Sequence, residues 1–176
     1  FPSARPELVV LPANTEEVSS ILEVANRAML PVVPRGMGTG LAAGSIPFSG
    51  EIILSLTRMD RLLDLDRENM MVTAEAGIIT SELADAVARE GYFYPPDPSS
   101  VDHSTLGGNV ACNAGGAHCL KYGITGDYVM ALEVVLADGR VMRVGGKTIK
   151  NVTGYDLVSL LVGSEGTLAV ITEVTV

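Results

Sequence analysis

Three glycine-dense segments, spread along one short chain, constrain what this sequence can fold into more than any other feature. They occupy residues 34–41, 105–116 and 163–168. Glycine has no Cβ, so its backbone N–H can approach a ligand closely, and it reaches positive φ angles that other residues avoid. Successive N–H groups in such loops form concave sites for anions. One such loop is a weak indication, but three of them predict a long, phosphate-bearing ligand that is held at several points along its length.

The composition restricts how such an anion can be bound. The chain has 176 residues, enough for one domain or two closely packed lobes. Its formal net charge of -9 would repel a phosphodiester backbone, so we expect no nucleic-acid partner. Phosphate contacts must therefore come from backbone N–H groups and one arginine. No apolar run approaches the ~18 residues of a membrane-spanning helix. The two cysteines make no disulfide framework, and a cytoplasmic location fits them.

The first part of the sequence predicts a small β-α-β lobe. Residues 8–11 have the pattern of a short buried strand, followed by a helix that Thr15 can cap. Pro31 ends this helix, and strands are expected at 32–33 and 52–56. The order strand, helix, strand implies parallel pairing with a right-handed crossover. We therefore expect a first lobe over residues 1–57.

The remainder predicts a larger lobe over residues 58–176. Charge concentrates between positions 57 and 69, which we interpret as the lobe boundary, and residues 71–76 should form the first strand of the second lobe. The other expected elements are a helix from Thr80 or Ser81 to Gly91, a loop over 92–100, a hairpin of 129–136 and 140–144 turned at Asp138-Gly139, a helix over 156–162 and a strand over 167–176.

Two familiar nucleotide-binding motifs do not fit this sequence. The segment that begins at Gly38 matches the loose dinucleotide fingerprint, but Gly44 and Pro47 come too soon for the helix that the fingerprint requires. Residues 145–148 resemble the end of a Walker A loop, yet Val141 stands where that motif needs its first glycine.

Other candidate groups have two interpretations each. A helix that begins at Gly107 and Gly108 would offer free N–H groups to an anion. The alternative is that its small residues allow tight packing. The polar residues between positions 150 and 156 are either functional or a cap for the next helix. The histidines and cysteines have no spacing typical of zinc ligands, so we expect no metal site. No nucleophile elbow accompanies the histidines.

Taken together, the motifs resemble the FAD-binding domain of the vanillyl-alcohol oxidase / p-cresol methylhydroxylase superfamily. Within it they are most similar to glycolate oxidase D subunits and to D-lactate and D-2-hydroxyglutarate dehydrogenases. The matching stretches are VPRGMGTGL at 33–41, TLGGNVACNAGG at 105–116, KYG at 121–123 and GSEGTLAVITE at 163–173. The resemblance implies an α+β fold with two lobes that clasp FAD, a small β-α-β lobe and a larger lobe with a mixed or antiparallel sheet and helices.

The resemblance also implies roles for individual residues. The backbone N–H groups of residues 36–41 would hold the FAD pyrophosphate. The segments 97–99 and 105–109 would lie near the pyrophosphate and flavin, Asn113 and Gly115 would face the isoalloxazine, and Gly166 and Ile171 would line the other end of the groove. The full set of expected cofactor-binding residues is Pro34, Arg35, Gly36, Met37, Gly38, Thr39, Gly40, Leu41, Asp97, Pro98, Ser99, Thr105, Gly107, Gly108, Asn109, Asn113, Gly115, Gly166 and Ile171.

The implied function is that of an FAD-dependent 2-hydroxy-acid dehydrogenase or oxidase, in which hydride passes from a D-2-hydroxy acid such as glycolate or D-lactate to the flavin. Covalent members of the superfamily often attach the flavin to a histidine of the first loop. This loop has none, so noncovalent FAD is expected. Family members continue into a C-terminal cap domain that supplies the substrate-binding and proton-accepting groups. We expect that domain or a partner subunit to complete this chain, and no catalytic base can be named within it.

Three hypotheses stay open. The first is this FAD-binding fragment of an oxidoreductase, acting on a small 2-hydroxy acid and passing electrons to a protein or a quinone. Any membrane association would be made through such partners. The second is a noncatalytic subunit that holds flavin within a larger electron-transfer complex. The third is a nucleotide-binding module without a redox role.

Overall fold

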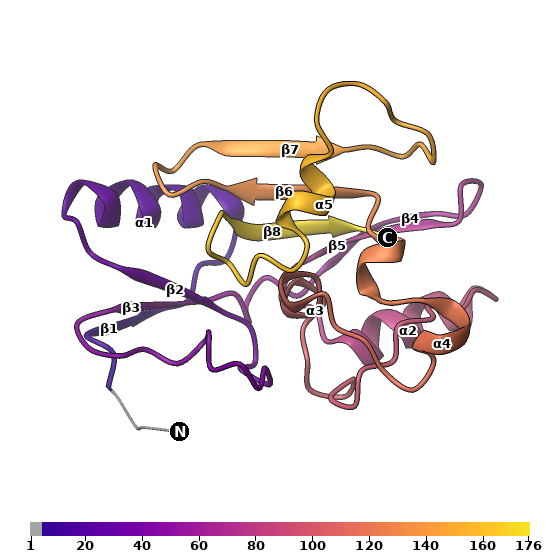
Figure 1. The fold of residues 1–176 in the computed structure, drawn as a ribbon, viewed down its shortest axis with the longest axis horizontal. Coiled ribbons are helices and arrows are strands. Elements are labelled where there is room, and N and C mark those ends of the chain that lie inside the picture. The colour runs from indigo at the N-terminus through magenta and orange to yellow at the C-terminus, as the bar shows by residue number, and fades with distance from the viewer. Residues whose placement is uncertain (1–4) are drawn as a thin grey trace.

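The computed structural model describes residues 5–176, so residues 1–4 of the expected first lobe lie outside the described residues. Its strands form a small parallel sheet and a larger antiparallel sheet, with short helices around the larger one (Figure 1). The α+β class expected from the sequence is confirmed. Within the described residues no helix is both long and apolar enough to cross a membrane.

The small sheet consists of β1 (Leu8–Val10), β3 (Ile52–Ser55) and β2 (Val32–Arg35), with β3 in the middle. Both pairs are parallel, as predicted. β3 is buried along its length because it has a neighbour on each side. β1 has only one neighbour, and Leu8 and Val9 remain 51% and 49% exposed. The prediction that β1 is a buried strand is therefore wrong, because an edge position leaves even apolar side chains open to solvent.

Helix α1 (Thr15–Arg27) connects β1 to β2 of the small sheet and lies beside the larger sheet (Figure 1). Its cap is Asn14, not Thr15 as expected: Asn14 Oδ1 accepts a hydrogen bond from the Glu17 N–H at 2.9 Å. The Thr15 hydroxyl donates instead to Glu133 Oε1 on the larger sheet, at 2.7 Å. Thr15 therefore links α1 to the larger sheet, and the residue before it satisfies the free N–H.

The larger sheet is antiparallel throughout. Its strands, in spatial order, are β4 (Leu62–Asp66), β5 (Met71–Glu75), β8 (Val170–Thr175), β6 (Ala131–Val135) and β7 (Val141–Gly145). The hairpin of β6 and β7 was predicted, but β4 was not. It lies inside the charged stretch that we interpreted as a boundary, so β5 is not the first strand of this sheet. β4 is an edge strand with a register shift after Leu62, which explains why aspartates alternate with its leucines.

Five short helices complete the chain. They are α2 (Thr80–Arg89), α3 (Leu106–Cys112), α4 (Cys119–Tyr122), the 3₁₀-helix η1 (Thr125–Tyr128) and α5 (Leu157–Leu161). α2 begins at Thr80 as expected, and α5 lies within its expected range. Asp156 Oδ1 accepts from the Ser159 N–H at 3.0 Å and so caps α5. This bond favours the structural interpretation of the polar residues before that helix.

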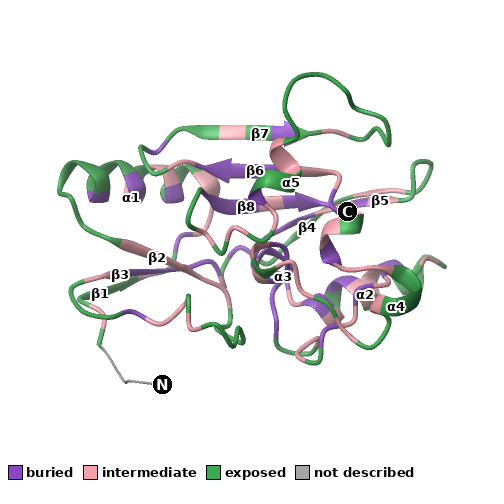
Figure 2. Ribbon diagram, viewed as in Figure 1, coloured by how far each residue is buried: buried purple, intermediate pink, exposed green. Residues whose placement is uncertain are grey.

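One apolar core lies against the larger sheet. Buried residues concentrate along β3, β6, β8 and α3 (Figure 2). Leu54 of the small sheet, Leu106 of α3 and Val134 of the larger sheet belong to this same core and are fully buried. Shared burial across both sheets holds the lobes together mainly by the hydrophobic effect.

A row of three glutamates crosses the larger sheet. Glu75, Glu173 and Glu133 are direct neighbours on β5, β8 and β6. The outer two have arginine partners, Arg61 for Glu75 and Arg143 for Glu133, each with an N–O distance of 2.7 Å. Glu173 reaches only Arg143 Nη2, at 3.6 Å. Burial raises the pKa of Glu173, and the charge of Glu133 raises it further.

The pKa of Glu133 shifts the other way. Burial alone would raise it, but hydrogen bonds from Thr15 and Arg143 and the charge of Arg143 outweigh burial and lower it. In this row Glu173 therefore has no close cationic partner among the described residues, whereas Glu75 and Glu133 on either side of it are each paired with an arginine.

Candidate functional site

A cavity of about 430 Å³ lies between the two sheets and is lined by all three glycine segments. It contains nearly all of the residues expected from the sequence. These are Pro34, Arg35, Gly36, Met37, Gly38, Thr39, Gly40, Leu41, Pro98, Ser99, Thr105, Gly107, Gly108, Asn109, Gly115, Gly166 and Ile171. Asp97 and Asn113 are not among the lining residues. The structure therefore gathers segments that are far apart in the sequence around one space.

The first glycine loop leaves β2 and presents its backbone to the cavity. None of the backbone N–H groups of residues 36–41 has a hydrogen-bond partner among residues 5–176. Gly36 is half-buried and residues 37–41 are exposed, so these N–H groups are open to water or to a ligand in the cavity. Gly38 has φ +71°, a left-handed conformation that favours glycine. Successive unpaired N–H groups of this kind can form a concave site for an anion.

The second glycine segment meets the first at Gly36. A Cβ on Gly36 would overlap Thr105 Oγ1 and would lie 3.2 Å from Thr105 Cγ2. The same Oγ1 accepts from the Gly108 N–H at 3.2 Å and caps α3. Thr105 therefore fixes both the start of α3 and the distance between the two loops.

The start of α3 does not offer the free donors that we considered from the sequence. The Leu106 N–H bonds to the Ile78 carbonyl at 2.9 Å, and the Gly107 N–H bonds to the Ala76 carbonyl at 2.8 Å. Since the Gly108 N–H bonds to Thr105 Oγ1, the first three N–H groups of the helix all have partners. A Cβ on Gly107 would meet Ala76 Cβ at 2.5 Å. The alternative of tight packing therefore explains these two glycines.

Two asparagines of this segment are occupied by structural contacts. Asn109 Nδ2 donates to Thr80 Oγ1 at 2.7 Å, and Asn109 is buried. Asn113 has φ 48° at the end of α3, and its Oδ1 accepts from the Gly126 N–H at 2.9 Å. Their side chains hold the loop in place, which leaves mainly backbone groups to face the cavity.

The third glycine segment is tied to the other two. The N–H groups of Gly163 and Glu165 bond to carbonyls of α3, Val110 at 3.0 Å and Ala111 at 2.8 Å. A Cβ on Gly166 would meet Pro34 Cγ at 3.0 Å. Since Pro34 begins the first loop, the three segments contact one another in a ring around the cavity. Residue 165 itself has φ 52°, a conformation that a glutamate adopts only when its surroundings impose it.

Several lining residues carry no signal that sequence reasoning could use. Leu56 and Ala76 contribute to the cavity from the ends of β3 and β5. Cys112 also lines it, and burial together with the nearby Glu165 raises the pKa of its thiol. Arg35 and Glu165 are the charged residues that line the described cavity. No histidine lines this space.

The residues outside the cavity include the pair that comes nearest to an acid–base arrangement. His118 Nδ1 lies 3.5 Å from Asp97 Oδ2, and neither residue lines the cavity. The Asp97 carbonyl packs so closely on Gly116 that a Cβ there would overlap it. Asp97 therefore serves as a packing point for the second glycine segment. Within residues 5–176, no three His, Cys, Asp or Glu side chains are grouped to hold a metal ion.

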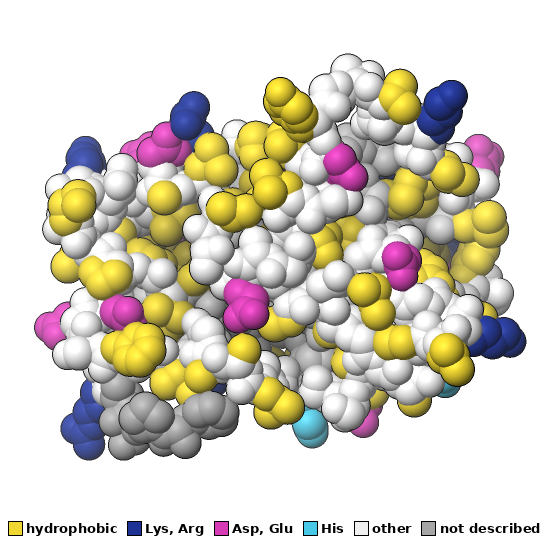
Figure 3. Space-filling view, in the orientation of Figure 1, with side chains coloured by type: hydrophobic (Ala, Val, Ile, Leu, Met, Phe, Trp, Pro, Cys, Tyr) yellow, Lys and Arg dark blue, Asp and Glu magenta, His cyan; other side chains and the backbone are white. Residues whose placement is uncertain are grey.

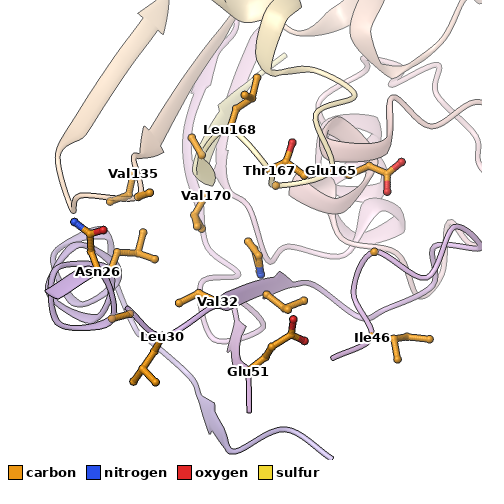
Figure 4. Close-up of a pocket in the computed structure, with 18 of the residues that line it drawn as sticks. Asn26, Leu30, Val32, Ile46, Glu51, Val135, Glu165, Thr167, Leu168 and Val170 are labelled. Atoms are coloured by element: carbon orange, nitrogen blue, oxygen red, sulfur yellow. The ribbon is translucent and has the colours of Figure 1, made fainter. Parts of the chain in front are cut away.

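A second cavity, of about 510 Å³, continues from the first. The two share Pro34, Gly44, Glu165, Gly166 and Ala169. Figure 4 shows Asn26 and Leu30 on one side of it, Ile46 and Glu165 on the other, and the Glu51 carboxylate between them. The cleft between the sheets is therefore long and mostly apolar at this end, as an extended ligand with an aromatic end requires.

Comparison with known proteins agrees with this geometry. A family model described as an FAD binding domain matches residues 6–145. Glycolate oxidase subunit GlcD of Bacillus subtilis is 50% identical over 97% of this chain and 36% of its own length. D-lactate dehydrogenase of Archaeoglobus fulgidus is 51% identical over 96% of this chain and 38% of its own length.

A solved structure of alkyldihydroxyacetonephosphate synthase has the same fold, with a TM-score of 0.85 at 29% identity. It covers 95% of this chain, which spans 30% of that protein. The chain thus covers well under half of each relative's length. The family model matches most of the chain, and FAD is confirmed as the expected cofactor. This chain belongs to the FAD binding domain family.

Proposed function

We propose that this chain is the FAD-binding part of a flavin-dependent oxidoreductase that oxidises a D-2-hydroxy acid, of the glycolate or D-lactate type, to the 2-oxo acid. The observation that carries the proposal is the run of unpaired N–H groups over residues 36–41 in a cavity ringed by three glycine segments. The relatives named as a glycolate oxidase subunit and a D-lactate dehydrogenase support the choice of substrate class.

The proposed orientation of the cofactor follows the three segments. The N–H groups of residues 36–41 would hold the pyrophosphate, and residues 98–99 and 105–109 would lie beside it and the flavin. Gly115 would lie at the flavin end, with Asp97 and Asn113 at its margin. Gly166 and Ile171 would line the other end. The shared residues of the two cavities support a ligand that extends in that direction.

The proposed attachment is noncovalent. Covalent members of the superfamily often attach the flavin to a histidine, and no histidine lines the described cavity. Cys112 is a nucleophile in the lining, but the raised pKa of its thiol keeps it protonated at neutral pH.

The chain's own residues would bind and orient, and other residues would move the proton. FAD, when bound, supplies the electron-accepting chemistry. The oxidation of an alcohol also needs a base within hydrogen-bond reach of the hydroxyl. Arg35 and Glu165, the charged lining residues, belong to the first and third glycine segments, and no histidine lines the described cavity. We therefore propose that a further domain or a partner subunit supplies the base and holds the substrate carboxylate, with electrons passing to a protein or a quinone.

We also propose a division of the chain into lobes at residues 57 and 58. The separation of its strands into two sheets supports this boundary. A cytoplasmic location is proposed because Cys112 and Cys119 are both free thiols. Any association with a membrane would be made through partners.

Exposed apolar side chains support the proposal that further protein covers this domain. Hydrophobic side chains stand out over the loop between β7 and α5 (Figure 3). Those that are most exposed on this loop and on α5, which follows it, are Ile149, Val152, Tyr155 and Leu160. Contiguous exposed apolar surface marks an interaction site. The chain on its own is therefore expected to self-associate at high concentration, and a monomer by light scattering would contradict this.

The test is reduction of bound flavin. The FAD-loaded protein is mixed anaerobically with D-lactate or glycolate, with L-lactate as the control. Bleaching of the visible flavin band by a D-2-hydroxy acid, and not by L-lactate, supports the proposal. A second candidate, a noncatalytic flavin-holding subunit, is favoured by the absence of a histidine in the described lining. Flavin that binds but stays oxidised with every acid, even when the completing domain or subunit is present, would establish that candidate instead.

A further inference from the structure

Arg35 occupies the inside of the first glycine loop. It is the last residue of β2, and its Nη1 donates to the Ser45 carbonyl at 2.9 Å. Its guanidinium also lies directly against Gly38, where a Cβ would overlap Nη2 and Cζ and would lie 2.9 Å from Nη1. One side chain therefore contacts both the outgoing and the returning limb of the loop.

The loop has few other contacts of its own. Residues 36–41 make no backbone hydrogen bond among the described residues, and the bond that closes the returning limb is Ile46 N–H to the Ala43 carbonyl at 3.0 Å. A loop without internal hydrogen bonds loses little energy when it changes conformation. Gly38 adds to this freedom, because glycine is the least restricted residue. The planar guanidinium is thus the main element that opposes collapse of the loop.

In the part of the chain that the structure describes, most of the N–H donors of the Arg35 guanidinium are free to bind a ligand. A guanidinium carries five N–H groups, and one of them is used on Ser45. The others have no partner among residues 5–176, and Arg35 lines the cavity. Arg35 is therefore placed to hold the two limbs of the loop apart before any anion arrives.

We propose that Arg35 is a positioning residue that holds the loop over residues 36–45 in its anion-binding conformation in the ligand-free protein. The proposal rests on the proposed function, in that this loop receives the pyrophosphate of FAD. The proposal goes beyond that function, because it assigns the affinity of the loop for an anion to the contacts of Arg35 within the loop and not to its positive charge alone. Planar shape matters here, so lysine cannot replace arginine.

Two substitutions separate the brace from the charge. Arg35→Lys keeps the positive charge but loses the planar fork, and Arg35→Gln loses the charge as well. Both should weaken binding of ADP and of FAD by a similar factor, about ten- to a hundredfold for the loss of a charged hydrogen bond. Arg58→Lys is the matched control, since Arg58 Nη1 also donates to a backbone carbonyl, that of Leu11 at 2.8 Å, away from the cavity. It should leave both affinities unchanged.

A second readout does not depend on ligand at all. Backbone ¹⁵N order parameters of residues 36–45 in the ligand-free protein should fall in both Arg35 variants and stay at the wild-type level in Arg58→Lys. Wild-type order and wild-type affinity in Arg35→Lys, with losses only in Arg35→Gln, would overturn the proposal in favour of a purely electrostatic role. If the wild-type protein bound neither FAD nor ADP, the proposed function would fail, while the order parameters would still decide whether Arg35 braces the loop.

Discussion

The contact between Gly36 and Thr105 allows a stringent prediction, because it joins the first two glycine segments. Gly36→Ala places a methyl group where Thr105 Oγ1 now lies. Overpacking of this kind costs about 1–3 kcal/mol. Thr105→Ala removes the α3 cap, at a cost of about 1 kcal/mol. If the two effects were independent, the double variant would lose about 2–4 kcal/mol.

The structure predicts a smaller loss in the double variant, because Thr105→Ala also removes the atom that the new methyl group would strike. Its destabilisation should be close to that of Thr105→Ala alone, about 1 kcal/mol, which corresponds to a drop in Tm of about 2–4 °C for a chain of this size. FAD affinity should follow the same pattern, falling in Gly36→Ala and recovering in part in the double variant.

The assay is thermal unfolding of the ligand-free protein, together with FAD titration by flavin fluorescence. Gly146→Ala is the control, since a Cβ there would meet nothing within 4 Å. It should leave Tm and FAD affinity near the wild-type values. A Gly36→Ala protein as stable as wild type, or a double variant that shows the full sum of the single losses, would refute the contact between the loops.

Three further predictions concern the row of glutamates on the larger sheet and the helix α1. Glu173→Gln should raise stability at pH 7 by about 0.5–1 kcal/mol by removing repulsion from its cross-strand neighbours. Because the pKa of Glu173 is raised in the folded protein, the folded state takes up its proton first, and stability falls as pH rises from the ordinary value of 4.5 through the raised one. The advantage of Glu173→Gln in urea unfolding should therefore vanish near pH 4, and an advantage that is constant with pH would contradict the charge argument. Glu133→Ala should destabilise by about 1–3 kcal/mol, since it removes the acceptor of the hydrogen bonds from Thr15 and Thr172, while the exposed guanidinium of Arg143 stays in water; an unchanged free energy of unfolding by the same method would exclude a structural role for Glu133. Asn14→Ala should cost about 1 kcal/mol through loss of the α1 cap, and an unchanged urea midpoint would mean that another group satisfies the Glu17 N–H.

The parts of the fold that follow local patterns could be predicted from the sequence. The β-α-β order gave the parallel sheet, and the Asp138-Gly139 turn gave the hairpin of β6 and β7, with Gly139 at φ 87°. Edge strands could not be predicted in the same way. The aspartates of β4 made its segment read as a charged boundary, and the apolar residues of β1 predicted a buried strand. Both predictions failed because the exposure of an edge strand depends on which neighbours it acquires in three dimensions.

The candidate site, like the fold, could be predicted only in part from the sequence. Most of the residues expected to bind the cofactor line the cavity, because glycine marks the places where backbones approach each other or a ligand. Their contact with FAD stays a prediction. The role of each glycine was predicted less well, since a glycine can serve either for close packing or for approach to a ligand. Gly107 packs on Ala76, whereas Gly38 packs on the Arg35 guanidinium, and nothing in the sequence distinguishes the two. Leu56 lines the cavity without any polar or glycine signal.

The most direct test of the central claim is the visible absorption spectrum of the purified protein after FAD has been added and the excess removed, recorded before and after denaturation and filtration. The account predicts flavin bands that stay with the folded protein and pass the filter once it is unfolded. Flavin retained with the unfolded polypeptide would show a covalent bond and contradict the noncovalent site. A folded protein that retains no flavin would contradict the assignment of the three glycine segments to FAD.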